Sequence, residues 1–273
     1  MAISIIIPTY KEPDHLELCL RSALETMVNK DNQILVYVDG TGELEGNQKV
    51  IEQYKDRVTF VVATENRGMC VGMNKAVALA HYNNCLIIND DMVFPKNWDI
   101  VLENYIKPGR ILITGAMEPR QSGYPDVLSG PFGTDPKTFN LEEFWKESYK
   151  PELEATIRIG GDRLPFLINK YEYLAMGGWD ENCIHGLQAD DEFFVKAKIL
   201  KLETVVVPSI IFYHFSMTSV NDENLAKNGK VTRSGVFEQN YRYLADKWGG
   251  AFPLNVGMKQ VCLIDTKTRQ III

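Results

Sequence analysis

An apolar run in the first half of the chain ends abruptly on an amide and two carboxylates, Asn89, Asp90 and Asp91. Residues 86–88 have the composition of a buried strand, so these polar side chains fall where the strand leaves the sheet. Carboxylate oxygens there suit a hard divalent cation, which can in turn bind a phosphate. The alternative is that both acids start a turn or cap a helix over residues 95–98.

A second group of acids, Asp190, Asp191 and Glu192, stands about 100 residues downstream where a helix is predicted to begin. The helix dipole stabilises acids in a first turn, so end-capping is their simplest interpretation. His214 follows the apolar stretch 210–213, and a lone histidine in such a place is usually structural. Whether these groups belong to one site depends on the elements that carry them.

Strand and helix patterns alternate four times in the first half of the chain. The β-branched or apolar runs 3–7, 34–38, 58–62 and 86–88 predict strands, and helical spacing separates them. This alternation predicts an α/β fold with a mainly parallel sheet that helices cover on both faces. Ligands of such sheets bind outside the carboxyl ends of the strands. We therefore expect one site at the polar strand exits, which are Thr9, Asp39, Asn66 and the Asp90–Asp91 pair.

The second half of the chain has a different pattern. Residues 111–115, 164–168 and 204–208 predict further strands, whereas 118–136 is rich in Gly, Pro and Ser and predicts a loop. A short helix is expected over 139–149, with Phe144 and Trp145 as anchors. Long loops in compact domains are usually functional or disordered, and the aromatic residues favour an ordered binding element.

Composition excludes several classes of protein. The chain has 273 residues, 45% of them hydrophobic, and a formal net charge of −7, which argues against a nucleic-acid partner. No apolar segment approaches the roughly 18 to 20 residues of a membrane span, and the first residues lack the flanks of a signal peptide. The five cysteines are widely spaced without a C-x-x-C pair, which favours reduced thiols. We expect a cytoplasmic protein, with peripheral association with a membrane left open.

Several short motifs, in this order and spacing, resemble the family 2 glycosyltransferases of the GT-A fold over roughly residues 3–248. Each motif is weak alone, whereas the series is specific. The motifs are Pro8-Thr9-Tyr10, Val38-Asp39-Gly40, Glu65-Asn66-Arg67-Gly68, Asn89-Asp90-Asp91 in place of a D-x-D motif, Gly177-Gly178-Trp179-Asp180-Glu181, Ala189-Asp190-Asp191, His214, and Asn240-Tyr241-Arg242-Tyr243 with Lys247-Trp248-Gly249.

The resemblance implies a nucleotide-sugar donor, most naturally a UDP- or dTDP-sugar. It implies that Asp91 and His214 bind Mn²⁺ or Mg²⁺, which neutralises the charge of the leaving diphosphate. The family's nucleotide lies across the first strand exits. The nucleotide-binding residues carried over are Pro8, Thr9, Tyr10, Glu12, Asp39, Asn66, Arg67, Asn74, Asn89 and Asp90.

The resemblance also assigns the acceptor side. A carboxylate across the sugar from the metal removes the acceptor's proton in a direct, inverting displacement, and Asp190 is the first candidate with Asp191 the second. Gly177, Gly178 and Trp179 are expected at the donor or acceptor sugar, and Trp145 at the acceptor. The sugar would be a hexose or deoxyhexose, and the acceptor a saccharide, a lipid-linked saccharide or a protein.

Some residues depart from the family pattern, and two other functions stay open. Asn89 stands in place of an acid, Ala189 in place of a glutamate, and Asn74 lies in a variant of the usual Ala-Arg-Asn segment. A nucleotidyltransferase acting on a sugar phosphate would want a glycine-rich loop after the first strand, which this chain lacks. An inactive carbohydrate- or nucleotide-binding relative would have lost the base or a metal ligand, yet Asp91, Asp190 and His214 are present.

The expected organisation is one GT-A domain over residues 1–250 with an acceptor-side extension. Residues 1–115 would form the nucleotide-sugar half and 116–250 the acceptor-binding and catalytic half. Residues 251–273 form a tail for which the sequence predicts no role.

Overall fold

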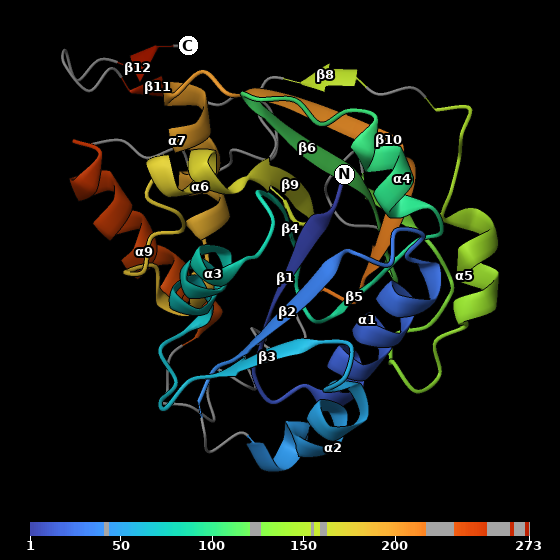
Figure 1. Ribbon diagram of the computed structural model, residues 1–273. Coiled ribbons are helices and arrows are strands. Elements are labelled where there is room, and N and C mark those ends of the chain that lie inside the picture. The colour runs from blue at the N-terminus through green and yellow to red at the C-terminus, as the bar shows by residue number, and fades with distance from the viewer. Residues whose placement is uncertain are drawn as a thin grey trace.

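The computed structural model describes residues 1–40, 44–120, 127–153, 156–158, 163–216, 232–249, 263–264 and 271–272. Ten strands form one sheet with the order β3-β2-β1-β4-β9-β6-β10-β5, in which β7 pairs with β6 and β8 with β10. Helices lie on both faces of this curled sheet (Figure 1). The predicted fold class, an α/β GT-A architecture with a mainly parallel sheet, is confirmed.

The first half is a run of parallel strands joined by helices, as the sequence predicts. β1 pairs with both β2 and β4, and β2 pairs with β3, all in parallel. The elements are β1 (Ile3–Thr9), α1 (Pro13–Thr26), β2 (Gln33–Val38), α2 (Leu44–Tyr54), β3 (Thr59–Val62), α3 (Met69–Leu79) and β4 (Asn84–Ile87).

The second half adds antiparallel strands, since β5 and β8 each pair antiparallel with β10. β9 runs antiparallel between β4 and β6. The stretch 118–136, predicted as a loop, begins on the last residue of β6 and contains β7, while residues 121–126 lie outside the described part. The elements are β5 (Met92–Val93), α4 (Trp98–Glu103), β6 (Arg110–Glu118), β7 (Val127–Ser129), α5 (Leu141–Glu147), β8 (Thr156–Arg158), β9 (Phe166–Asn169), α6 (Lys170–Ala175), the 3-10 turn η2 (Ile184–Gly186), α7 (Ala189–Ile199), β10 (Glu203–His214), α9 (Arg233–Lys247), β11 (Leu263–Ile264) and β12 (Ile271–Ile272).

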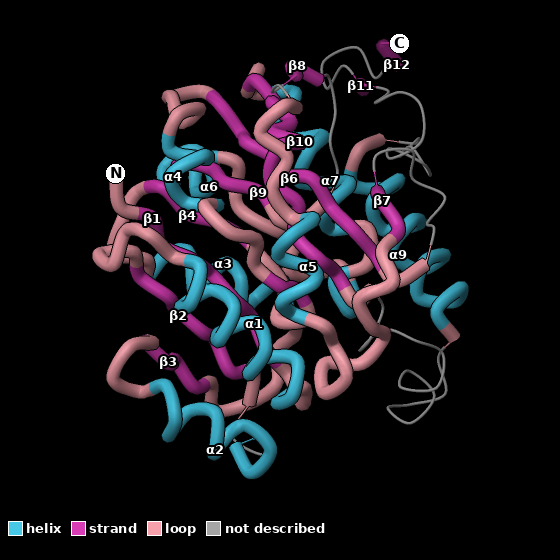
Figure 2. The backbone as a smooth tube through the Cα atoms, turned by 90° about the vertical axis from the view of Figure 1, so that its right-hand side faces the viewer, coloured by secondary structure: helices cyan, strands magenta, loops and turns pink. Residues whose placement is uncertain are grey.

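Two apolar clusters sandwich the sheet because successive strand side chains point to opposite faces. In β1, Ile5 packs with α1, α2 and α4, whereas Ile6 packs with α3, α6, α7 and α9. Figure 1 shows the strands between these two sets of helices, and Figure 2 views the sheet from the side that α1, α4 and α5 cover. Burial of both faces explains why the parallel strands read as continuous apolar runs.

Strand β10 ends at His214, one of the two predicted metal ligands, at the carboxyl edge of the sheet. Its pairing with β6 shifts register between Val207 and Ile211, around Pro208, which has no N–H to donate to the ladder. The two predicted segments 204–208 and 210–213 are therefore one bent strand. Of the tail 251–273, only the short antiparallel pair β11–β12 is described, so the prediction of an unassigned tail stays a prediction.

Candidate active site at the carboxyl edge of the sheet

Asp91 and His214 meet at this edge although 123 positions of sequence numbering separate them. β5 follows Asp91 and pairs antiparallel with the end of β10, which sets His214 opposite Met92. The Phe215 N–H also donates to the Asp91 backbone carbonyl at 3.0 Å. As a result, His214 Nε2 lies 3.4 Å from Asp91 Oδ1, and Asp91 is 6% exposed.

A second carboxylate, which sequence reasoning missed, holds the other side of the imidazole. Glu118, the last residue of β6, places Oε1 3.4 Å from His214 Nδ1. Burial by itself would lower the pKa of His214, but the charges and hydrogen bonds of Asp91 and Glu118 raise it to about 10. Glu118 has no local sequence signal because its role depends on the β6–β10 pairing.

Negative charge is concentrated around this pair. Burial and the adjacent Asp91 raise the pKa of Asp90 to about 7, although the Thr9 hydroxyl opposes the shift. His15 on α1, also missed from sequence, places Nδ1 3.1 Å from Glu12 Oε2. Burial lowers the pKa of His15, but the Glu12 hydrogen bond and the Asp91 and Asp90 charges raise it. The helical i, i+3 spacing from Glu12 was the only signal for His15.

An unsatisfied acceptor lies beside these groups. The Asn89 side-chain oxygen is buried and makes no hydrogen bond within the protein. Buried polar atoms are nearly always paired, so an orphaned amide oxygen at a strand exit indicates a group that a ligand would satisfy. An amide oxygen is also among the ligands that hard cations accept.

The strand exits nearer β2 form a backbone cradle. The carboxylate of Asp39 accepts hydrogen bonds from the N–H groups of Arg67 at 2.9 Å and Gly68 at 2.7 Å, which fixes the loop before α3. The side chains of Asn66 and Arg67 are exposed beside this cradle. The Asp39 carboxylate therefore holds the backbone of the loop before α3. The side chains of Asn66 and Arg67 remain exposed next to that loop, where the sequence predicts a nucleotide.

The remaining predicted nucleotide contacts lie at the end of β1 and just after it. Pro8 and Thr9 are buried in the strand, with Thr9 paired to Val38 of β2. Tyr10 and Glu12 are partly exposed, and Lys11 Nζ lies 5.0 Å from the centroid of the Tyr10 ring. These groups frame the same edge as Asp39.

Asn74 has a different role from the nucleotide contact that we predicted. Its oxygen accepts from Tyr173 OH at 2.7 Å and Trp179 N–H at 2.8 Å, and its amide donates to Trp179 O and Glu181 Oε1. A primary amide has two donors and two acceptor sites, so no hydrogen-bonding capacity is left for a nucleotide. Asn74 instead ties α3 to the Gly-Gly-Trp-Asp-Glu segment.

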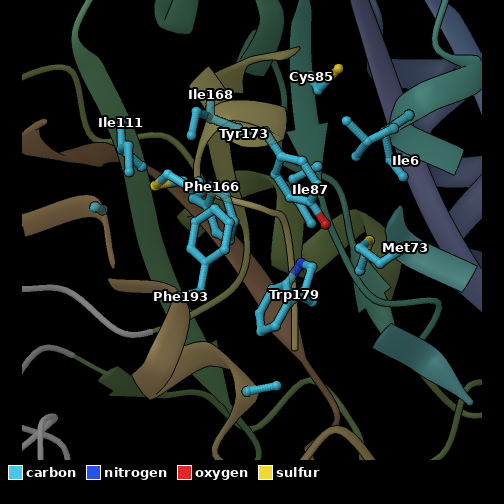
Figure 3. Close-up of a cluster of buried hydrophobic side chains, with 14 of the residues drawn as sticks. Ile6, Met73, Cys85, Ile87, Ile111, Phe166, Ile168, Tyr173, Trp179 and Phe193 are labelled. Atoms are coloured by element: carbon cyan, nitrogen blue, oxygen red, sulfur yellow. The ribbon is translucent and has the colours of Figure 1, made fainter. Parts of the chain in front are cut away.

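The segment from Gly177 to Glu181 packs around Asn74, and the indole of Trp179 is buried within it. Gly177 and Gly178 have φ of 81° and 64°, and a Cβ on Gly178 would overlap the Asn74 amide. Trp179 is 1% exposed and stacks on Phe193, with ring centroids 5.3 Å apart and planes 20° apart (Figure 3). With 1% of Trp179 exposed, tertiary packing leaves no ring face open in this structure, and its predicted contact with a sugar stays a prediction.

Trp145 is also a core residue in this structure. It is 7% exposed, and its indole N–H donates to the Phe94 carbonyl at 3.0 Å. It packs in an aromatic-rich cluster that fastens α5 to β5 and β10. The prediction of an ordered element over 139–149 is supported by α5, but the predicted acceptor contact at Trp145 is not.

Asp190 and Asp191 lie in the first turn of α7, half-buried. Gln188 before them is left-handed at φ 64°, and the Asp191 N–H donates to Asp190 Oδ1 at 3.1 Å. The turn η2, just before α7, packs against the start of α3, since a Cβ on Gly186 would overlap Met69. Burial, and then the charges of Cys183, Asp180 and Asp190, raise the pKa of the Cys70 thiol on the first turn of α3. The base candidates therefore lie near the carboxyl edge at which α3 begins.

Two searches of the described residues gave negative results. Within them, no three His, Cys, Asp or Glu side chains gather closely enough to hold a metal by themselves. Within the same part of the chain, no helix is both long and apolar enough to cross a bilayer.

Residues 4–151 match the model of the family described as glycosyl transferase family 2. A search of curated protein sequences found no significant match. The match covers more than half of the chain and ends before the segment that carries Asp190.

Several solved structures share the fold at low sequence identity. TarS residues 1–349 of S. aureus align with a TM-score of 0.61 and 14% identity, over 91% of this chain and 72% of that one. The same protein in complex with UDP-GlcNAc gives a TM-score of 0.59, also at 14% identity, over 91% of this chain and 73% of that one. GalNAc-T7, with UDP, GalNAc and Mn²⁺, gives 0.61 and 13%, over 93% of this chain and 52% of that one.

Proposed function

Because this chain belongs to glycosyl transferase family 2 and has the GT-A fold, we propose that it transfers a sugar from a nucleotide-diphosphate donor to an acceptor hydroxyl. The observation that carries the proposal is the Asp91–His214 pair, 3.4 Å apart at the carboxyl edge of the sheet. Relatives of the same fold hold UDP and UDP-GlcNAc. We propose a UDP- or dTDP-sugar for this chain, with a hexose or deoxyhexose as the transferred group.

The residues present fit a divalent cation. His214 Nε2 lies 3.4 Å from Asp91 Oδ1, so both could face one cation, and a carboxylate is a ligand that Mn²⁺ and Mg²⁺ accept. Among the described residues, no third acidic, cysteine or histidine side chain completes a metal cage. When bound, the cation would neutralise charge developing on the diphosphate. Asp91 and His214 would hold it, with Asn89 and Asp90 beside them.

The protein's own residues supply the rest of the reaction. We propose that Asp190, or Asp191 next to it, accepts the proton of the acceptor hydroxyl while the hydroxyl oxygen forms a bond to the anomeric carbon of the donor sugar. The bond from that carbon to the diphosphate breaks in the same step, and the diphosphate leaves with the electron pair. Attack from the side opposite the leaving group inverts the anomeric centre.

The donor and acceptor would occupy different halves of the molecule. Thr9, Tyr10, Glu12 and the loop that Asp39 shapes would bind the nucleotide, in the half formed by residues 1–115. The half formed by residues 116–250 would bind a saccharide, a lipid-linked saccharide or a protein side chain. The Gly177–Gly178 turn, whose Gly178 carbonyl accepts from Lys196 of α7, belongs to this second half.

The metal assignment is tested by donor binding. We expect a panel of UDP-glucose, UDP-GlcNAc and dTDP-rhamnose to include a donor that raises the melting temperature only with Mn²⁺, since a ligand of the native state stabilises it. Asp91→Asn should abolish this metal-dependent binding in calorimetry. Asp56→Asn, a change at an exposed acid away from the edge, is the matched control. Unchanged metal-dependent affinity in Asp91→Asn would refute the assignment.

The base assignment is tested separately by turnover. Asp190→Asn should keep donor binding while metal-dependent release of nucleoside diphosphate from the selected donor falls by roughly 10² to 10⁴. Water serves as the acceptor in this assay because the base would deprotonate it in the same way. If Asp191→Asn is the inactive variant instead, the role moves by one residue.

A further inference from the structure

Helix α9 presents three polar side chains to the segment that leads to the proposed base. Asn240, Tyr243 and Lys247 are spaced i, i+3 and i+7, so they share one face of the helix. α9 covers the same side of the sheet as α7 (Figure 1). It also lies outside the region 4–151 that the family model matches.

Lys247 joins two buried carboxylates on separate segments. Its Nζ lies 2.7 Å from Asp180 Oδ2 and 2.7 Å from Glu192 Oε1. The Asp180 and Glu192 side chains are 4% and 0% exposed, and Lys196 pairs with the second Glu192 oxygen at 2.7 Å. Lys196 also donates to the Gly178 carbonyl. The lysines thus connect the glycine turn, α7 and α9.

The other two residues of the face hold the connecting chain. Tyr243 OH donates to Asp180 Oδ2 at 2.9 Å. The Asn240 oxygen accepts from the Ile184 N–H at 2.9 Å, and its amide donates to the carbonyls of Ile184 at 3.0 Å and Leu187 at 2.9 Å. Each of the three residues on this face of α9 therefore contacts the segment that runs from Asp180 to the start of α7, or α7 itself.

This chain needs external support because its backbone is irregular. His185 and Gln188 both have positive φ, at 53° and 64°, which side chains other than glycine rarely adopt. Glu192 and Asp190 differ by two positions on α7, so they point roughly 160° apart around the helix axis. Holding Glu192 in the core consequently fixes the rotation of α7 and the direction of Asp190.

We infer that Lys247, with Tyr243, is a positioning residue that sets the place of Asp190 relative to the donor. The inference rests on the proposed function, since it assigns a role to residues that support the proposed base. A displacement of about 1 Å can cost on the order of 10²-fold in rate without any loss of binding. The effect of losing Lys247 should therefore fall on kcat and leave donor affinity unchanged.

The test compares Lys247→Met with Arg242→Met on the same helix. Arg242 is exposed and pairs with Glu238 along the surface of the helix. We expect Lys247→Met to lower kcat for diphosphate release from the selected panel donor by roughly 10- to 100-fold, with the donor dissociation constant in Mn²⁺ within about twofold of wild type. Lys247→Arg should restore part of kcat, because a cation again reaches both carboxylates. Arg242→Met should behave as wild type.

A second variant keeps the inference testable if Lys247→Met does not fold. Tyr243→Phe removes two hydrogen bonds, to Asp180 and from Asn182, and no charge, and we expect kcat to fall by about three- to tenfold at unchanged donor affinity. Wild-type kcat in Tyr243→Phe, or an equal loss of donor binding and kcat in Lys247→Met, would overturn the positioning role. The proposed function fails separately, if Asp190→Asn and Asp191→Asn both turn over normally.

Discussion

The two sides of the candidate site handle buried charge in opposite ways. On the proposed metal side, Asp91 and Glu118 flank the His214 imidazole, and Asp90 and Asp91 act electrostatically on the nearby His15. On the base side, the buried acids Asp180 and Glu192 each have a lysine within 2.7 Å. On the first side carboxylates outnumber the imidazoles, whereas the two buried acids of the second network are matched by two lysines, Lys196 and Lys247.

The difference indicates what each side is for. Clustered carboxylates repel one another and cost stability unless a cation joins them, so the metal side is suited to a ligand. Paired carboxylates in a closed network hold their segments in one arrangement, so the base side is suited to positioning. Function in this fold thus uses unbalanced charge where a ligand enters and balanced charge where geometry matters.

The largest effect is expected from Glu192→Gln. Removing one partner of a buried ion pair costs about 3–5 kcal/mol, because Lys196 and Lys247 lose the carboxylate between them. Urea unfolding of the metal-free protein measures this change in the free energy of unfolding. Glu238→Gln, at an exposed pair with Arg242, is the matched control and should change stability by less than about 0.5 kcal/mol. Equal effects of the two variants would contradict the idea of a balanced core network.

The next effect concerns Asn74, which ties α3 to Tyr173 and to the Gly-Gly-Trp-Asp-Glu segment. Asn74→Ala should cost about 2–3 kcal/mol of stability, since it leaves Tyr173 OH and the Trp179 N–H without their acceptor. Donor affinity in calorimetry should stay within about twofold of wild type. A large loss of donor affinity at unchanged stability would restore the nucleotide contact that its position in the sequence suggested.

The sequence predicted those parts of the molecule that depend on local pattern. The strands β1, β2, β3 and β4 are continuous apolar runs, and their polar exits follow from the direction of a parallel sheet. The place of β9 between β4 and β6 was not predictable, since antiparallel insertion leaves no mark on a short apolar run.

The candidate site shows the same division. Asp91 and His214 were predicted as partners through the resemblance to a family, and their side chains do meet. Trp145 and Trp179 were expected at sugars, but burial depends on tertiary contacts that an aromatic residue type does not reveal. Lys247 was noted only as part of a family motif, because nothing in the sequence indicates its contact with Asp180, 67 positions away.

A smaller effect of opposite sign is expected from Asp90→Asn. Burial and Asp91 raise the pKa of Asp90 to about 7 in the folded protein. The ionised carboxylate therefore lowers the free energy of unfolding once the pH exceeds the pKa of an aspartate in the unfolded chain. The neutral amide should stabilise the metal-free protein at pH 8 by about 1–3 kcal/mol. Thermal unfolding without divalent ions, compared with Asp246→Asn at an exposed site, measures the change. A loss of stability would show that the negative charge of Asp90 is already neutralised by its neighbours in the metal-free protein.

The smallest effect is a pH dependence on the base side. Burial would raise the pKa of Asp180, but hydrogen bonds from Lys247, the Asn182 N–H and Tyr243 lower it overall. A carboxyl whose folded pKa lies below its unfolded value stabilises the protein above the unfolded pKa of about 4, and this stabilisation is lost as the pH falls through the folded value. Wild type should therefore lose its advantage over Asp180→Asn as the pH falls from 6 to 3. Because Lys247 is 34% exposed, solvent screens the pair and limits the expected difference to about 1 kcal/mol. Urea unfolding at each pH gives the two curves, and parallel curves would mean that Asp180 does not titrate as the partner of Lys247.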